Sequence, residues 1–248
     1  MSGVPADLDG ALAEFAGRRP LLVASDYDGV LAPLVGVPSA AVPLPGIAEA
    51  LARVAAADGV TVALVSGRGV ADLQTTSGLT GAYRWVGSHG AEFDGPLTGE
   101  LADRRDALAQ LLAPAVAATP GALLEVKPAS VAVHVRQVQD RDAAAALLAH
   151  VRTLADSSLT LKPGKEVLEV TVTDADKGTA LRRLVEELRP ATTMYLGDDV
   201  TDEDGFRALA GPDDVTVKIG GGSTEARHRV PDTVGAVAVL NRLADLLT

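Results

Sequence analysis

The feature that most limits the fold of this chain is a repeated alternation of short apolar runs with segments of helical character. Apolar runs at residues 20–25, 59–67 and 83–90 are separated by segments at 46–58 and 69–75 in which apolar residues recur at helical spacing. The strands are apolar on both faces and helices join them. The pattern therefore predicts an α/β fold, with a doubly wound parallel sheet covered on both sides.

The alternation of single strands and helices is interrupted in the middle of the chain. A helix at about 100–113 is followed by a pair of strands within 122–138, a second helix at about 140–155, and another pair of strands within 159–172. This order predicts a small α+β module inserted into the first domain. Alternating strands and helices then return. The predicted domains are a discontinuous core of residues 1–96 and 176–248 and an inserted cap of residues 97–175.

Composition narrows the classes of partner and compartment. The formal net charge of −11 argues against a nucleic acid or an anionic membrane as the main partner. The absence of cysteine excludes disulfides and thiolate nucleophiles. Residues 1–20 contain neither a basic segment nor an apolar run typical of a signal peptide, and proline interrupts the uncharged stretches at 30–48 and 107–124. We therefore expect a soluble cytoplasmic protein that acts as a monomer on a small molecule.

Charged and hydroxyl side chains gather where the predicted strands end. Asp26 and Asp28 follow the first strand, Ser66 follows the second, Lys177 opens a helix, and an acidic stretch at 198–204 follows a later strand. In an open α/β sheet, ligands bind outside the carboxyl ends of the strands. The sequence therefore predicts one site that contains all of these side chains.

The residue types at this edge indicate phosphoryl transfer. Several carboxylates close together need a cation, and hard oxygen ligands suit Mg²⁺. A lysine and a serine hydroxyl are natural partners of phosphate oxygens. One carboxylate can attack phosphorus and form an aspartyl-phosphate, while another acts as general acid and base. Each of these acidic or hydroxyl-containing stretches, taken alone, is more commonly a turn or a helix cap, so the prediction depends on their combination.

The order of the motifs "DYDGVL" (26–31), "VSGR" (65–68), "DKG" (176–178) and "GDDVTDED" (197–204) resembles that of the haloacid dehalogenase (HAD) superfamily of phosphatases. Within it, the stretches "GSHGAEFDG", "KPASVAVHVR", "KPGKEVLEV" and "YLGDDVTDED" are similar to the trehalose-6-phosphate phosphatase family, over about residues 20–240. The resemblance implies a HAD-like core with a cap, and Mg²⁺-dependent hydrolysis of trehalose 6-phosphate.

The resemblance also implies roles for the motif residues. Asp26 would be the nucleophile and Asp28 the general acid and base, while Ser66 and Lys177 would hold the phosphoryl oxygens. Asp202 would orient water or Lys177. The implied metal residues are Asp26, Asp28 through its main-chain carbonyl, Asp198 and Asp199. The implied substrate contacts in the core add Tyr27, Gly67, Arg68 and His89 to Asp26, Asp28, Ser66 and Lys177.

In the family the cap closes over the sugar, and polar residues of the two predicted strand pairs are the candidates for its hydroxyls. Strand alternation would place His134 and Arg136 on one face. The full set of cap candidates is Lys127, His134, Arg136, Lys165, Glu166 and Glu169.

Two departures from the family pattern keep alternatives open. Val30 stands where the family usually has threonine, and Thr171–Val172 where it often has Arg-Pro. One alternative is a phosphatase of another sugar phosphate, such as sucrose 6-phosphate or a pseudo-disaccharide phosphate. Another is a sugar-phosphate-binding homologue with weak catalysis. A receiver-like signalling module also uses an acidic pocket and a lysine, but it is about half this length and has no cap.

Overall fold

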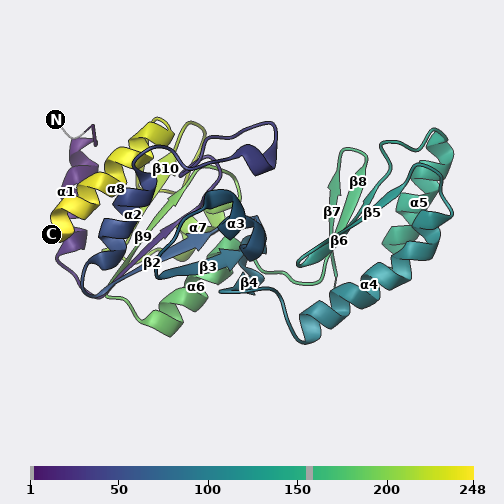
Figure 1. The fold of residues 1–248 in the computed structure, drawn as a ribbon, viewed down its shortest axis with the longest axis horizontal. Coiled ribbons are helices and arrows are strands. Elements are labelled where there is room, and N and C mark those ends of the chain that lie inside the picture. The colour runs from purple at the N-terminus through teal and green to yellow at the C-terminus, as the bar shows by residue number, and fades with distance from the viewer. Residues whose placement is uncertain (1–2, 155–158) are drawn as a thin grey trace. The chain divides into compact units, whose positions relative to one another are not determined.

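The computed structural model describes residues 3–154 and 159–248 and divides the chain into two compact units. One unit consists of Met1–Gly95 with Ala175–Thr248, and the other of Pro96–Asp174. Figure 1 shows that the chain leaves the first unit once and returns to it once. We call them the core unit and the cap unit.

The core unit is built on a seven-stranded sheet with the order β11-β10-β9-β1-β2-β3-β4. The pairings are parallel except for the short edge strand β4. The central strand β1 lies between β2 and β9, so that its end is flanked by the ends of both neighbours. The strands are β1 (Leu21–Ser25), β2 (Val60–Val65), β3 (Tyr83–Gly87), β4 (Glu92–Phe93), β9 (Thr192–Gly197), β10 (Val215–Ile219) and β11 (His228–Val230).

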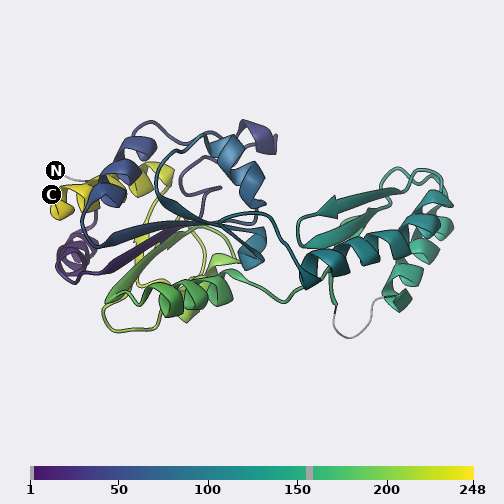
Figure 2. The ribbon, with the colours of Figure 1, turned by 60° about the horizontal axis from the view of Figure 1, so that its bottom comes forward.

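Helices cover both faces of this sheet, which confirms the predicted α/β class (Figure 2). Successive residues of β1 point to opposite faces, and both faces are buried. Leu21 and Val23 pack in the larger core cluster, whereas Leu22 and Ala24 pack in the smaller one. On the first face lie α1 (Ala6–Ala16), α2 (Ile47–Ala56), α3 (Val70–Ser77) and α8 (Thr233–Leu247), and on the second α6 (Lys177–Leu188) and α7 (Asp202–Ala208).

The predicted strand at 83–90 is shorter in the structure. Strand β3 ends at Gly87, and Ser88–Gly90 form a 3-10 turn. Ser88 and His89 both have positive φ angles, a conformation that cannot continue a strand. The turn leads the chain back along β3 as the antiparallel β4.

The cap unit is an α+β layer with its own core. Its sheet has the order β5-β6-β8-β7, with every pairing antiparallel. One face of the sheet packs on two helices and the other carries polar side chains. The elements are α4 (Glu100–Ala117), β5 (Leu123–Lys127), β6 (Ser130–His134), α5 (Arg141–Leu154), β7 (Thr160–Gly164) and β8 (Val167–Thr171).

The first cap helix is longer than its prediction. Helix α4 continues past Pro114 to Ala117, because the carbonyl of Pro114 still accepts the N–H of Ala118. Residue 155, the predicted end of the second cap helix, lies outside the described residues. Among the helices of the described ranges, none is both long and apolar enough to cross a membrane.

Candidate active site

The site lies where the central strands of the core unit end. Asp26 directly follows β1, Ser66 follows β2, and Asp198 follows β9. Because these strands are parallel neighbours, their carboxyl ends meet at one edge of the sheet. Lys177 is the first residue of α6, which is capped by Asp176 through a hydrogen bond from the Thr179 N–H.

Lys177 joins two acids from different parts of the chain. Its Nζ lies 2.8 Å from Oδ2 of Asp26 and 2.7 Å from Oδ1 of Asp202. All three side chains are buried, at 7% exposure or less. Burial raises the pKa of Asp26 to about 7, against the opposing charge of Lys177. Burial alone would lower the pKa of Lys177, but Asp26 and Asp202 raise it above its ordinary value, so the ammonium stays charged.

Asp202 organises the cluster with both carboxylate oxygens. Besides Lys177, its Oδ1 accepts the Tyr195 hydroxyl at 2.5 Å. Its Oδ2 accepts the main-chain N–H groups of Asp198 and Asp199, each at 2.9 Å. Four donors therefore satisfy this carboxylate, and it shapes the acidic turn after β9.

Asp198 supplies the oxygen that remains without a partner. Its Oδ1 is buried and accepts no hydrogen bond from the described residues. Burial, followed by the charge of Asp202, raises its pKa to about 6. Asp26, Asp198 and Asp202 each offer an oxygen within 4.8 Å of the others. An unpartnered oxygen among three acids fits a hard divalent cation such as Mg²⁺. The side chain of Asp199 is exposed and stands outside this group of three.

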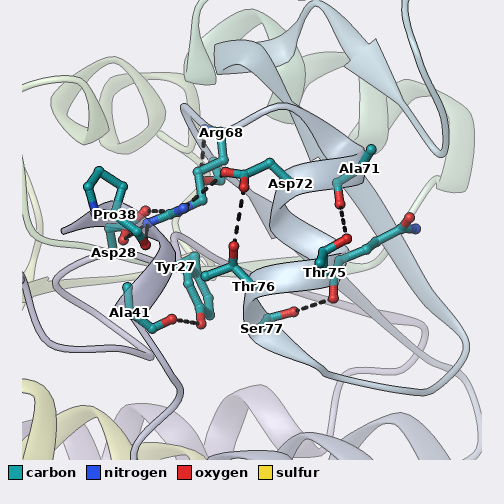
Figure 3. A network of polar contacts seen from close by, with 12 residues as sticks. Tyr27, Asp28, Pro38, Ala41, Arg68, Ala71, Asp72, Thr75, Thr76 and Ser77 are labelled. Atoms are coloured by element: carbon teal, nitrogen blue, oxygen red, sulfur yellow. Dashed lines mark hydrogen bonds and ion pairs between the residues drawn. The ribbon is translucent and has the colours of Figure 1, made fainter.

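Asp28 is held by Arg68 in a two-pronged ion pair, which Figure 3 shows with its neighbours. Arg68 Nε lies 2.6 Å from Asp28 Oδ2, and Nη2 lies 2.8 Å from Oδ1. The same guanidinium donates to Oδ2 of Asp72 at 2.9 Å and to the carbonyl of Pro38 at 2.7 Å. Four of its five N–H donors are therefore used within the protein. In this arrangement Arg68 orients Asp28, and one of its N–H donors remains for a substrate oxygen.

Ser66 and His89 are brought together by the backbone. The Ser66 carbonyl accepts the main-chain N–H of His89 at 2.9 Å, and the Ser66 hydroxyl accepts the N–H of Arg68 at 3.2 Å. A Cβ at Gly67 would lie 2.6 Å from the His89 ring, so a larger residue there would displace the ring. The half-buried His89 ring thus lies directly over the loop that follows β2.

The side chain of Tyr27, which the resemblance places among the substrate contacts, does not lie in the site. Its side chain is fully buried in the larger core cluster, and its hydroxyl donates to the Ala41 carbonyl at 2.5 Å (Figure 3). The ring therefore cannot contact a substrate. Only its main-chain N–H reaches the site, where it donates to Asp26 Oδ1 at 2.6 Å.

In the cap unit, three of the candidate residues lie on the polar face of the sheet. Lys127 donates to Glu169 Oε2 at 2.8 Å, and the Ser130 hydroxyl donates to Oε1 at 2.6 Å. Nε2 of His134, on the same face, lies 2.8 Å from Glu125 Oε2. This face thus holds alternating donors and acceptors, which suit hydroxyl-rich ligands.

The predicted shared face of His134 and Arg136 is wrong. Strand β6 ends at His134, and the chain turns so that the N–H of Val138 donates to the Val135 carbonyl. Arg136 therefore leaves the sheet, with a side chain 73% exposed and 3.7 Å from Glu166. Glu166 also pairs with Arg141, and Lys165 stands exposed in the turn between β7 and β8.

Two further residues of the site were missed from the sequence, Tyr195 and Lys218. Both carry a polar group at the end of a long side chain inside fully buried strands, "TTMYLG" and "VTVKI". Tyr195 reaches Asp202, and Lys218 donates to the main-chain carbonyl of Asp198. A polar residue within a buried strand is the signal that identifies them.

The core sheet, the inserted cap and the acid cluster define a HAD-like fold. A haloacid dehalogenase-like hydrolase from Bacteroides thetaiotaomicron superposes with a TM-score of 0.66 at 14% identity, covering 89% of this chain and 98% of that one. The chain belongs to the trehalose-phosphatase family, whose model matches residues 24–230.

Similar proteins carry names consistent with this family. Trehalose-6-phosphate phosphatase from Aspergillus fumigatus superposes with a TM-score of 0.74 at 26% identity, covering 98% of each chain. Trehalose-phosphate phosphatase from Mycolicibacterium paratuberculosis is 36% identical, over 97% of this chain but only 66% of its own length. The chain thus spans about two thirds of the length of that relative.

Proposed function

We propose that this chain hydrolyses trehalose 6-phosphate to trehalose and inorganic phosphate with Mg²⁺ as cofactor. The observation that carries the proposal is the cluster of buried Asp26 and Lys177 with half-buried Asp198 at the carboxyl ends of the central strands. A carboxylate beside a fixed ammonium and an unpartnered acid oxygen suits attack on a phosphoryl group. Membership of the trehalose-phosphatase family supports the choice of substrate.

Asp26, Asp198 and the main-chain carbonyl of Asp28 are the groups that would hold Mg²⁺. When bound, the ion would supply positive charge that offsets the negative charge developing on the phosphoryl oxygens. Asp202 is already satisfied by four donors, so we assign it to orientation of Lys177 and of the acidic turn.

The reaction proceeds through two transfers at phosphorus. Asp26 attacks the phosphorus and forms an aspartyl-phosphate as the bond to the sugar oxygen breaks, while Asp28, which enters this step protonated, gives that oxygen its proton. Asp28 then takes a proton from the water that attacks the aspartyl-phosphate and releases phosphate. Lys177 has three N–H donors and uses two of them on Asp26 and Asp202, which leaves one for a phosphoryl oxygen.

The identity of the sugar depends on the cap unit. Its polar face, with Lys127, Ser130, His134 and Glu169, offers hydrogen-bonding groups to a disaccharide. Sucrose 6-phosphate and pseudo-disaccharide phosphates present similar hydroxyls and remain the alternative substrates. We also propose that the protein acts as a cytoplasmic monomer: the absence of cysteine is compatible with a reducing compartment, and a net charge of −11 disfavours self-association.

Phosphate release from a panel of substrates tests this function. The purified chain is assayed with trehalose 6-phosphate, sucrose 6-phosphate and glucose 6-phosphate, each with Mg²⁺ and with EDTA. We expect the highest kcat/KM for trehalose 6-phosphate and no turnover in EDTA. Equal turnover of glucose 6-phosphate would contradict the assigned specificity. A higher kcat/KM for sucrose 6-phosphate would favour the alternative.

A further inference from the structure

A buried ion pair, between Lys218 and Glu203, lies beside the acid cluster. Lys218, near the end of β10, has a side chain 5% exposed, and its Nζ lies 3.7 Å from Oε1 of Glu203, which is 11% exposed. Glu203 Oε2 accepts the main-chain N–H of Glu225 at 2.8 Å, but Oε1 accepts no hydrogen bond within the described ranges. A buried pair with such incomplete bonding is a weak source of stability.

The contact that distinguishes Lys218 is with the backbone of Asp198. Lys218 is paired with Gly197 in the ladder between β10 and β9, so its side chain starts beside the end of β9. Its Nζ donates to the main-chain carbonyl of Asp198 at 2.5 Å. The main-chain N–H of Asp198 donates to Asp202. The two polar backbone groups of residue 198 are thus held from opposite sides, one by β10 and one by α7.

We propose that Lys218 is a positioning residue for the metal site. By holding the carbonyl of Asp198, with Glu203 beside its ammonium, it keeps the unpartnered carboxylate oxygen of Asp198 directed at the acid cluster. Groups behind a ligand that fix its orientation commonly determine metal affinity. The inference rests on the proposed function, because it takes this cluster to be where a divalent cation binds.

Electrostatics alone predicts the opposite effect. An ammonium close to a metal site repels the incoming cation, so its removal would tighten metal binding. Positioning predicts that removal weakens binding, since Asp198 loses its orientation. The direction of the change therefore separates the two explanations.

Direct binding of Mn²⁺ to the purified chain, followed by the electron paramagnetic resonance signal of the free ion, provides the test. We expect Lys218→Met to weaken binding by about 10-fold or more. Lys218→Arg keeps a cationic donor and should recover most of the affinity. The matched control is Arg229→Met, because Arg229 is the ladder partner of Lys218 on β11 and donates to the carbonyls of Gly220 and Gly222.

A double variant, Lys218→Met with Glu203→Gln, keeps the test valid if the single variant does not fold, because it leaves no unpaired buried charge. Thermal unfolding identifies the folded variants. Weak binding by the double variant, with parental binding by Arg229→Met, supports the proposal. Parental or tighter Mn²⁺ binding by folded Lys218→Met or by the double variant overturns it. If the parent binds no Mn²⁺, the metal site of the proposed function fails as well, whereas a binding parent with insensitive variants removes only the role of Lys218.

Discussion

Asp202 is the side chain on which the order of the acid cluster depends. It is fully buried and receives donors from Lys177, Tyr195 and two main-chain N–H groups. Asp202→Asn removes the charge and replaces one acceptor with a donor that would face existing donors. Breaking a buried ion pair in this way costs about 3–5 kcal/mol, and we expect a loss of this size in the free energy of unfolding.

Urea denaturation measures that loss. The control is Asp204→Asn, two residues further along α7, where an exposed pair with Arg207 should contribute less than about 1 kcal/mol. Equal stability of the two variants would show that Asp202 does not hold the cluster together.

Arg68 offers a second test with a single side chain. Because its guanidinium is bound to Asp28 and Asp72, we expect Arg68→Met to lower kcat by about 10-fold or more through a misplaced acid and base, with KM nearly unchanged. Steady-state kinetics on trehalose 6-phosphate separates the two constants. A large rise in KM at constant kcat would instead make Arg68 a substrate contact, as the family resemblance implies.

The loop after β1 has to pass very close to the turn after β9. Gly29 has a φ of +78°, and a Cβ placed there would lie 2.0 Å from Oδ2 of Asp198. Gly29→Ala should therefore destabilise the fold by about 1–3 kcal/mol and weaken Mn²⁺ binding, because Asp198 must move. Gly36→Ala, where nothing lies within 4 Å of the new Cβ, serves as the control in the same loop. Unchanged Mn²⁺ affinity in Gly29→Ala would contradict the close approach.

The cap sheet should lose stability in acid through Glu169. Burial acts to raise the pKa of this carboxyl, but Lys127 and Ser130 outweigh it and hold the pKa below the ordinary 4.5. The folded pKa is depressed, so the stabilisation is complete above pH 4.5 and is lost as the pH falls through the folded pKa.

Hydrogen exchange of the β6 and β8 amides between pH 6 and 3, with rates corrected for intrinsic exchange, measures this effect. We expect Glu169→Gln to flatten the pH dependence, whereas Glu125→Gln, on the more exposed neighbouring strand, should leave it in place. An unchanged slope in Glu169→Gln would assign the acid sensitivity to another group.

The elements were predictable wherever burial alone decides them. Apolar strands such as β1 and β9 are buried on both faces, and their composition indicates this directly. The ends of β3 and β6 were not predictable, because they are decided by local turns: Ser88 takes a positive φ, and the chain turns directly after Val135, whose N–H still donates to the Glu166 carbonyl. Because β6 ends at His134, Arg136 does not share the sheet face with His134 as predicted.

Across the whole chain, the charged residues of the site could be predicted from the sequence, whereas the residues that hold them in place could not. Asp26, Lys177 and Asp198 are charged residues at strand or helix ends, where the topology of a parallel sheet brings them to one edge. Tyr195 and Lys218 support them through contacts that depend on the folded arrangement, and although both stand out as polar residues in buried strands, no spacing rule gives their partners. The partner of Arg68 likewise depends on how two loops meet.

The assignment of Asp26 as nucleophile is tested most directly by phosphate release from trehalose 6-phosphate by the parent and by Asp26→Asn in the presence of Mg²⁺. Asparagine keeps the size of the side chain and removes only the nucleophilic charge, and circular dichroism checks that the variant is folded. We predict turnover by the parent and none above background by the folded variant. Appreciable phosphate release by folded Asp26→Asn would contradict the mechanism proposed for this chain.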